Sequence, residues 1–385
     1  MQGLAQFLRS IQGDMLLPQA FVETPRFTQT FRVPAAALPP GHDGFQLQYA
    51  DVGYRKDPAR PEDESVLLYF VPLGASRLAS IAKDDLARSQ RVRIISVDKP
   101  GSGGTTALAA AADLLPVFCD AIAALLRHLG IRSVSVASHC TGAIYALHFL
   151  LHHTEFLSSV PGQSCVFFGT PWIQVRRGTP FRTRVFQCMP QWVCRLRYRR
   201  AVRDKLRWAL PAPQMRSALY IDHRHFDEQV ASMITRRDFV EDGLGGLFQE
   251  VQLALLRKPF SRRRGWADWG NADTLVPRLA QKLRDEGKTL RVYTLYAEED
   301  GIIGAPDSKA LDWFDMCWLD RKAQDVITYS SSVVVGACHT TIWSNRHKGI
   351  YKMLEITSRV QKARVVKETG VTPPEQLFIE EMLGL

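Results

Sequence analysis

The chain has 385 residues, of which 46% are hydrophobic and 23% are charged. This apolar fraction excludes an intrinsically disordered or low-complexity chain, and the length fits two average domains or one large α/β domain with an insertion. The formal net charge is +10, and residues 171–264 alone carry 20 Lys or Arg against 8 Asp or Glu. The basic character is therefore concentrated in one segment.

Short apolar runs alternate with helix-like segments over most of the chain. The pattern predicts strands at residues 45–52, 66–71, 92–97, 133–137, 165–168, 291–296 and 326–335, and helices at 113–129 and 141–153. The first strand, FQLQYADV, alternates like an antiparallel edge strand. Apolar strands that alternate with helices indicate a mainly parallel sheet with helices on both faces, so the predicted fold class is α/β.

The alternation stops near residue 170 and resumes near residue 289. We interpret residues 170–287 as a basic, mostly helical lid inserted into an α/β core, whose two parts are residues 1–169 and 288–385. An independent second domain is the alternative, but too little of the segment is strand-like to favour it.

The cysteine and asparagine content bears on the compartment. The seven cysteines are odd in number and show no CxxC spacing, which argues against a disulfide framework or a zinc ribbon. Neither of the two asparagines begins a glycosylation sequon, and the first residues lack a continuous apolar region. We therefore expect an intracellular, cytoplasmic protein that needs no metal ion and no organic cofactor.

The segment SVSVASHCTGAIYAL reads as a strand, a tight turn and a helix, with Cys140 at the turn. A nucleophile elbow needs small residues two positions before and two positions after the nucleophile, and Ser138 and Gly142 meet this need. The backbone N–H of Thr141 then lies at a helix N-terminus, where it can stabilise an oxyanion. Taken alone, Cys140 is better interpreted as a small buried residue, but the elbow and the partners that follow it in the chain favour a nucleophile.

A nucleophile needs a base and an orienting acid, which follow it in the order acid, then histidine, in folds with such an elbow. His339 follows a predicted strand through a short loop, whereas His347 lies between Arg346 and Lys348 and reads as a solvated residue. For the acid we choose Asp300, which directly precedes a glycine turn, while Glu298 and Glu299 remain alternatives.

These motifs resemble a known family. SHCTGAIYAL is similar to the SHSAG-type elbow of fungal α/β-hydrolase-fold proteins. Along the chain, VPLGASR and VDKPGSGGTT before it, and GTPW, AEEDGIIG, WFDMCW and GACHTT after it, resemble the other motifs of these proteins in the same order. The resemblance covers residues 45–172 and 290–352. It implies an α/β-hydrolase fold with esterase, lipase or thioesterase activity, in some members within fungal secondary metabolism.

The sequence departs from this family at two places. Cys140 replaces the usual serine, and Val71-Pro72 replaces the frequent His-Gly of the oxyanion loop. The N–H of Leu73 is still expected to be the second oxyanion donor. A thiol beside a histidine and a helix N-terminus ionises readily, so Cys140 need not abolish activity. Because an acyl-thioenzyme is a higher-energy intermediate than an ester, a Cys140–His339–Asp300 triad is expected to favour activated acyl groups such as lactones and thioesters.

We therefore predict a hydrolase of an ester, lactone or thioester. A non-hydrolytic enzyme for cyclisation, condensation or acyl transfer and a catalytically inactive ligand-binding protein remain alternatives. The basic lid can be a solvated helical face, a surface that attracts an anionic acyl substrate such as a CoA or phosphopantetheine thioester, or a membrane contact. The first two interpretations are favoured, and nucleic acid is not expected because no recognition fold accompanies the charge.

Overall fold

A computed structural model describes residues 21–55, 65–173, 185, 193, 196, 245–255, 271–304, 306, 308–343 and 349–368. Its centre is an eight-stranded sheet in the order β1-β2-β4-β3-β5-β6-β7-β8. The strands are β1 (Gln29–Arg32), β2 (Gln46–Gly53), β3 (Ser65–Phe70), β4 (Val92–Val97), β5 (Ser135–His139), β6 (Cys165–Gly169), β7 (Leu290–Glu299) and β8 (Ile327–Cys338). The pairs β1–β2 and β2–β4 are antiparallel, and all the others are parallel.

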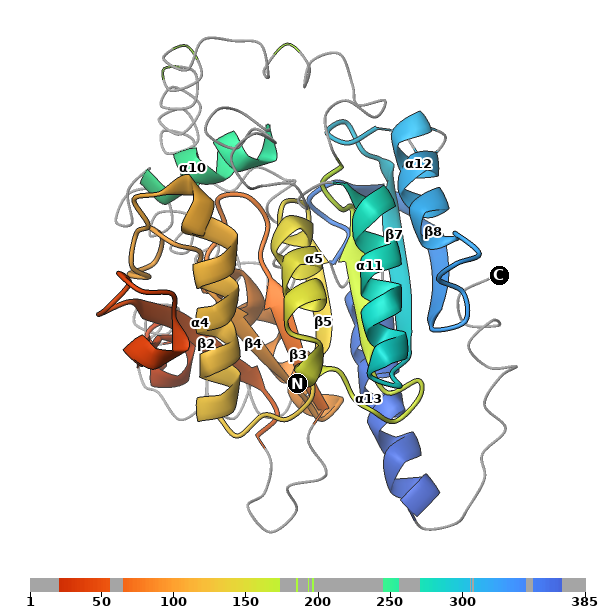
Figure 1. The fold of residues 1–385 in the computed structure, drawn as a ribbon, viewed down its shortest axis with the longest axis horizontal. Helices are drawn as coiled ribbons and strands as arrows, with labels where there is room; N and C mark the ends of the chain where they lie inside the picture. The colour runs from red at the N-terminus through yellow and green to blue at the C-terminus, as the bar shows by residue number, and fades with distance from the viewer. Residues whose placement is uncertain are drawn as a thin grey trace.

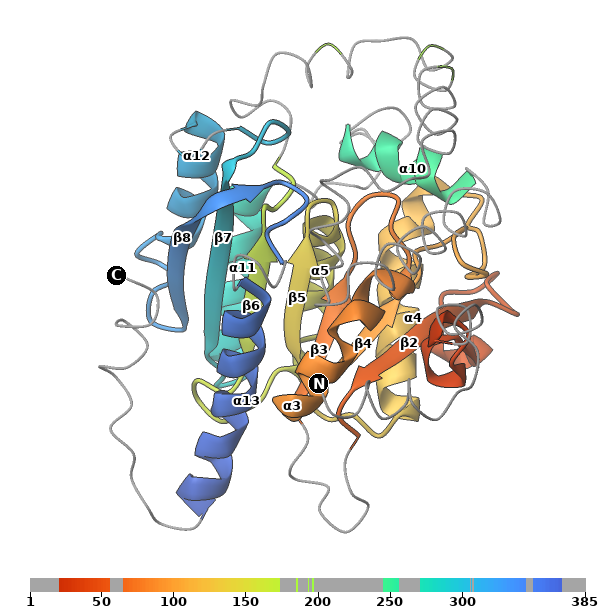
Figure 2. The same cartoon turned by 180° about the vertical axis from the view of Figure 1, so that it is seen from behind.

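Helices cover both faces of this sheet. Four lie on the face turned to the viewer in Figure 1: α4 (Leu114–His128), α5 (Gly142–His152), α11 (Ala272–Asp285) and α12 (Lys309–Trp318). On the opposite face, seen in Figure 2, lie α3 (Asp84–Ser89) and α13 (Gly349–Glu368). A further helix, α10 (Gly245–Ala254), crosses above the sheet edge in both views. Short 3-10 helices are η1 (Pro25–Phe27), η2 (Ala35–Ala37), η4 (Arg77–Lys83), η5 (Ala111–Asp113) and η6 (Thr154–Phe156).

The buried apolar side chains form two clusters, one on each face of the sheet. The first includes most of α4 and α5, with Phe118, Tyr145 and Phe149 almost completely buried. The second packs β3 and β4 against η4 and α13. The central strands β3, β4, β5 and β6 are buried along their whole length, as expected for parallel strands covered on both faces.

The α/β class and the mainly parallel sheet predicted from the sequence are confirmed. Each strand predicted in the core is present within a few residues of its expected position. The edge position predicted for β2 is wrong, because β1 pairs with its outer side through Phe31 and Leu47. With four residues and one buried side chain, β1 gives too short a pattern to be recognised.

The predicted lid at 170–287 lies mostly outside the described residues. At its end, α11 buries Leu275, Leu279 and Leu283 in the first core cluster beside α5 and α12. This helix lies between β6 and β7 in the chain and packs on the core, although it falls within the predicted lid; the division of the chain into core and lid stays a prediction. No helix among the described residues combines the length and the apolarity needed to cross a membrane.

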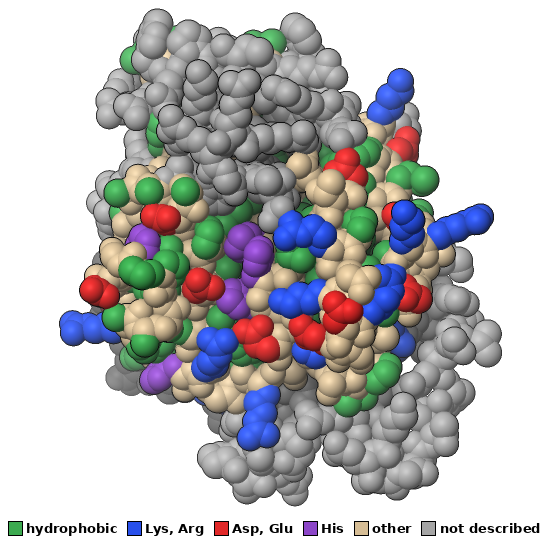
Figure 3. Space-filling view, in the orientation of Figure 1, with side chains coloured by type: hydrophobic (Ala, Val, Ile, Leu, Met, Phe, Trp, Pro, Cys, Tyr) green, Lys and Arg blue, Asp and Glu red, His purple; other side chains and the backbone are tan. Residues whose placement is uncertain are grey.

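The described surface in Figure 3 carries charges of both signs intermixed. On and beside α11, Arg284 pairs with Asp325 and Lys288 pairs with Glu286. The basic residues that dominate the insertion belong to ranges that the structure does not describe, so the expectation about a basic lid surface stays a prediction.

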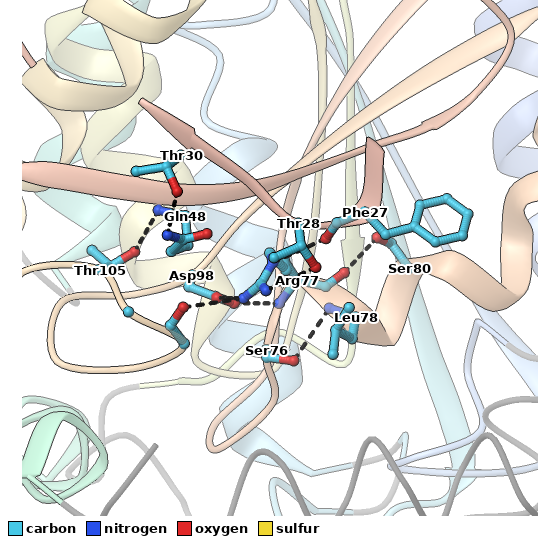
Figure 4. A network of polar contacts seen from close by, with 12 residues as sticks. Phe27, Thr28, Thr30, Gln48, Ser76, Arg77, Leu78, Ser80, Asp98 and Thr105 are labelled. Carbon is cyan, nitrogen blue, oxygen red and sulfur yellow. Dashed lines mark hydrogen bonds and ion pairs between the residues drawn. The ribbon is translucent and has the colours of Figure 1, made fainter. Parts of the chain in front are cut away.

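A buried ion pair fixes the loop between β3 and η4 (Figure 4). The Arg77 guanidinium pairs with Asp98, which also accepts from the Arg77 backbone N–H, and both side chains are almost fully buried. Arg77 Nε donates to the carbonyl of Phe27 at 3.0 Å. Gly103 has φ +57°, and a Cβ there would lie 1.7 Å from Asp98 Oδ2. The turn after β4 is thereby locked to the loop after β3.

We expect Asp98→Asn to lower the free energy of unfolding by about 3–5 kcal/mol, because it leaves the buried Arg77 charge uncompensated. Urea denaturation measures this change. The exposed Asp43→Asn is the matched control and should change stability by less than about 0.5 kcal/mol. Equal effects of the two substitutions would show that the buried pair does not fix this loop.

Candidate active site

Cys140 adopts a left-handed backbone conformation, with φ +52°, directly after β5. An L-residue with a Cβ pays about 1–2 kcal/mol for this conformation, so the surroundings must enforce it. Two backbone hydrogen bonds do so: Cys140 N–H donates to Gly169 O at 3.1 Å, and Trp172 N–H donates to Cys140 O at 3.0 Å. The strained turn places the thiol at the carboxyl edge of the parallel strands, where α/β folds bind ligands.

The two predicted packing residues of the elbow lie at close approaches. A Cβ on Gly142 would lie 2.3 Å from the carbonyl oxygen of Phe70, at the end of the neighbouring strand β3. Ser138 is completely buried, and its carbonyl accepts from Trp343 Nε1 at 3.2 Å. Only small side chains let α5 start this close to β3.

His339 follows β8 and pairs with Asp300, which follows β7. His339 Nδ1 donates to Asp300 Oδ2 at 2.7 Å, and both side chains are buried. The second carboxylate oxygen of Asp300 accepts from the N–H groups of Ile302 and Ile303 at 2.8 and 2.9 Å. The acid is therefore held on one side by its own turn and presents its other oxygen to the imidazole.

The other ring nitrogen of His339, Nε2, lies on the side of the ring away from Asp300, and the ring interacts electrostatically with Cys140. Nε2 is buried and has no hydrogen-bond partner of good geometry among the described residues. Burial lowers the pKa of His339, but the negative charge of Cys140 and the bond to Asp300 outweigh it and raise this pKa to about 10. The arrangement thus favours the imidazolium form of His339. Contacts of this kind are often loose without substrate and tighten when it binds.

A second histidine, His139, holds the loop that carries His339. Its Nε2 lies 2.8 Å from the carbonyl oxygen of His339, which can only accept, so Nε2 carries the proton. Burial, followed by the charge of His339, lowers the pKa of His139 to about 3, which keeps the ring neutral at pH 7. Thr170 Oγ1 donates to the same carbonyl at 3.4 Å. The loop that carries His339 is thus tied to β5 and to the residue that follows β6.

The two N–H groups expected to stabilise an oxyanion belong to Leu73 and Thr141. Thr141 is completely buried at the start of α5, and Leu73 lies on the partly exposed loop after β3. In the described part of the chain, neither N–H donates to another backbone group. Neither N–H is therefore engaged by another backbone group there, and the role of the two as oxyanion donors stays a prediction.

The structure brings Asp300 and Cys140 to His339, and it does not pair either of the two alternative acids with this histidine. Glu298 and Glu299 are exposed, and Glu298 accepts from the backbone of Gly336 at 2.7 Å. His347 lies outside the described residues.

Sequence reasoning missed three side chains at this site: His139, Lys99 and Glu250. His139 could have been noticed because it directly precedes Cys140, and Lys99 because it follows β4 at the same sheet edge. No sequence signal points to Glu250, which lies in the predicted lid at 170–287.

The described part of the chain contains no cluster of three or more His, Cys, Asp or Glu side chains suited to a metal ion. Its five cysteines are free thiols, of which Cys338 is partly exposed and the other four are buried. Cys140 is 6% exposed.

Comparisons with known proteins extend the description of the fold. No protein-family model matches the chain, and no curated protein sequence is significantly similar to it. A carboxylesterase from the thaumarchaeon Nitrososphaera gargenis is 16% identical, with 85% of this chain and 98% of that chain covered and a TM-score of 0.52. The esterase RhEst1 from Rhodococcus sp. ECU1013 is 16% identical, with coverage of 86% and 99% and a TM-score of 0.53.

A third similar structure is the epoxide hydrolase A from Mycobacterium thermoresistibile, which is 14% identical, with coverage of 86% and 98% and a TM-score of 0.52. At such identities the likeness is one of fold. Together with the strand order and the parallel core of the sheet, it shows that this chain has the α/β-hydrolase fold.

Proposed function

We propose that the protein hydrolyses an activated acyl compound, an ester, lactone or thioester, through Cys140, His339 and Asp300. The observation that carries the proposal is the left-handed Cys140 beside a His339 whose pKa the thiol itself helps to raise. The similar solved structures named above bear the names of esterases and an epoxide hydrolase, and they support hydrolytic chemistry on this fold.

In the first half of the reaction, the thiolate of Cys140 attacks the carbonyl carbon and forms a carbon–sulfur bond. The carbonyl oxygen becomes an oxyanion, which the N–H groups of Leu73 and Thr141 stabilise. The bond to the leaving alcohol or thiol then breaks, and His339 Nε2–H gives its proton to the leaving group. An acyl-thioenzyme remains on Cys140.

In the second half, neutral His339 takes a proton from water, and the hydroxide so formed attacks the acyl carbon. The carbon–sulfur bond breaks, the acid leaves, and the thiolate–imidazolium pair is restored. Asp300 keeps Nδ1 protonated and fixes the ring, so that Nε2 faces the reacting atoms throughout.

The substrate class follows from the nucleophile. An acyl-thioenzyme is a higher-energy intermediate than an acyl ester, so thioesters and strained lactones react more readily than plain esters. An anionic carrier such as CoA suits the basic residues of the insertion, most of which are outside the described ranges. A role in small-molecule secondary metabolism is part of the proposal and rests on the sequence resemblance.

Iodoacetamide labelling tests the pair of Cys140 and His339. We expect Cys140 to alkylate faster than the other described cysteines, and His339→Ala to slow this reaction by about tenfold or more, because the imidazolium stabilises the thiolate. Peptide mass spectrometry reads each cysteine separately. His152→Ala, at the far end of α5 from Cys140, is the matched control and should have no effect. A Cys140 that reacts no faster than the others would favour a ligand-binding protein.

The pKa of His339 gives a second test. The value of about 10 lies above the ordinary 6.5, so the folded state favours the imidazolium and gains stability that is complete below pH 6.5 and lost as the pH rises through about 10. Cys140→Ala removes the negative partner and should lower the pKa of His339, as measured by NMR of histidines labelled with ¹⁵N. An unchanged titration would mean that Cys140 is not the partner of His339.

A further inference from the structure

A buried ion pair joins the insertion to the candidate active site. Lys99, which follows β4, pairs with Glu250 on α10, and their side chains are 6% and 5% exposed. Taking two charges out of water costs several kcal/mol each unless further hydrogen bonds satisfy them. The partners of this pair therefore indicate what it does.

Both charged groups bind the parts of the chain that carry the oxyanion donors. Glu250 Oε1 accepts from Thr141 Oγ1 at 2.6 Å as well as from Lys99 Nζ. Lys99 Nζ also donates to the carbonyl oxygen of Pro72 at 2.9 Å. A continuous line of hydrogen bonds thus runs from the elbow at Thr141, through Glu250 and Lys99, to the loop after β3.

The bond to Pro72 matters because of the peptide group that it reaches. The carbonyl of Pro72 and the N–H of Leu73 belong to one peptide unit, which is planar and, before a residue other than proline, almost always trans. Its oxygen and its hydrogen then point in opposite directions. An ammonium group on the oxygen therefore fixes the direction of the Leu73 N–H and polarises it as a donor.

The helix that carries Glu250 is firmly attached to the core. Glu250 lies near the middle of α10, and Gly246 approaches the turn after β4 so closely that a Cβ there would lie 2.3 Å from Pro100 O. Gln249 Nε2 donates to Leu108 O at 2.7 Å, and Trp172 Nε1 donates to Ala254 O at 2.9 Å. Both ends of α10 are thereby fixed, and so is its carboxylate.

We propose that Lys99 and Glu250 are positioning residues of the oxyanion hole. They hold the Leu73 and Thr141 donors in a fixed relative position and strengthen the Leu73 N–H. This inference rests on the proposed acyl transfer to Cys140. It gives the insertion a part in catalysis, and it supplies an anchor for an oxyanion loop in which Val71-Pro72 stands in place of His-Gly.

Two reactions of the same thiol separate oxyanion stabilisation from thiol reactivity. Acylation by p-nitrophenyl butyrate forms a carbon–sulfur bond through an oxyanion and expels p-nitrophenolate, which needs no proton. Alkylation by iodoacetamide displaces iodide and forms no oxyanion. A variant with a disordered oxyanion hole therefore loses the first reaction and keeps the second.

We expect Lys99→Met to slow the acylation of Cys140 by about 10- to 100-fold, because the loss of one whole oxyanion donor costs about 10²–10³-fold. Iodoacetamide should alkylate the variant within about twofold of the unchanged protein. Stopped-flow release of p-nitrophenolate and peptide mass spectrometry measure the two rates. Lys309→Met, the same substitution at an exposed lysine, is the matched control and should change neither rate.

The double variant K99M/E250Q separates positioning from stability. Lys99→Met alone leaves the buried carboxylate of Glu250 without its cation and should destabilise the fold. Removal of both charges should restore the midpoint of urea denaturation towards that of the unchanged protein, while acylation stays slow.

The outcomes distinguish this inference from the proposed function. Acylation of the double variant at the original rate would overturn the positioning role and leave the acyl transfer intact. If the unchanged protein alkylates slowly and does not acylate at Cys140, both the proposed function and this inference are wrong.

Discussion

The backbone of Cys140 is the constraint on which the site depends. A left-handed residue with a Cβ at the end of β5 is unfavourable by itself. It persists because Gly169 of β6 accepts from the Cys140 N–H, Trp172 after β6 donates to the Cys140 carbonyl, and α5 starts against the end of β3. The strain is therefore supported by three neighbouring parallel strands. It lifts the thiol to the edge of the sheet at which β3, β4, β7 and β8 end and the loops after them begin.

The loops at this edge are fixed one by one through buried polar contacts. Arg77 and Asp98 lock the loop after β3 to the turn after β4. His139 and Thr170 hold the carbonyl of His339, and Asp300 holds its ring. Each buried polar group is costly unless it is paired, so these pairs specify one arrangement of the loops and pre-organise the site.

Much of this arrangement could be predicted from the sequence because local patterns encode it. The apolar runs locate the strands, and Ser138, Cys140 and Gly142 reveal a turn whose steric needs only small neighbours can meet. The order of the motifs singled out His339 and Asp300, which the structure places 2.7 Å apart through their side-chain atoms. The choice of Asp300 over Glu298 rested on its position before a glycine, and the structure adds the burial that the glutamates lack.

The remaining features depend on contacts between distant segments. Lys99 and Glu250 are 151 residues apart in the sequence, and nothing in the composition of the insertion distinguishes Glu250 from a solvated acid. The short strand β1 and the packing of α11 on the core are likewise set by tertiary contacts.

The central claim is that Cys140 accepts an acyl group. The most direct measurement is rapid acid quenching after mixing with a short acyl thioester, followed by mass spectrometry of the intact protein and of its peptides. A transient mass increase by one acyl group on the peptide containing Cys140, which persists longer in His339→Ala once formed, is the predicted result. An absence of any acyl adduct on Cys140, with the thioester left intact, would contradict the claim.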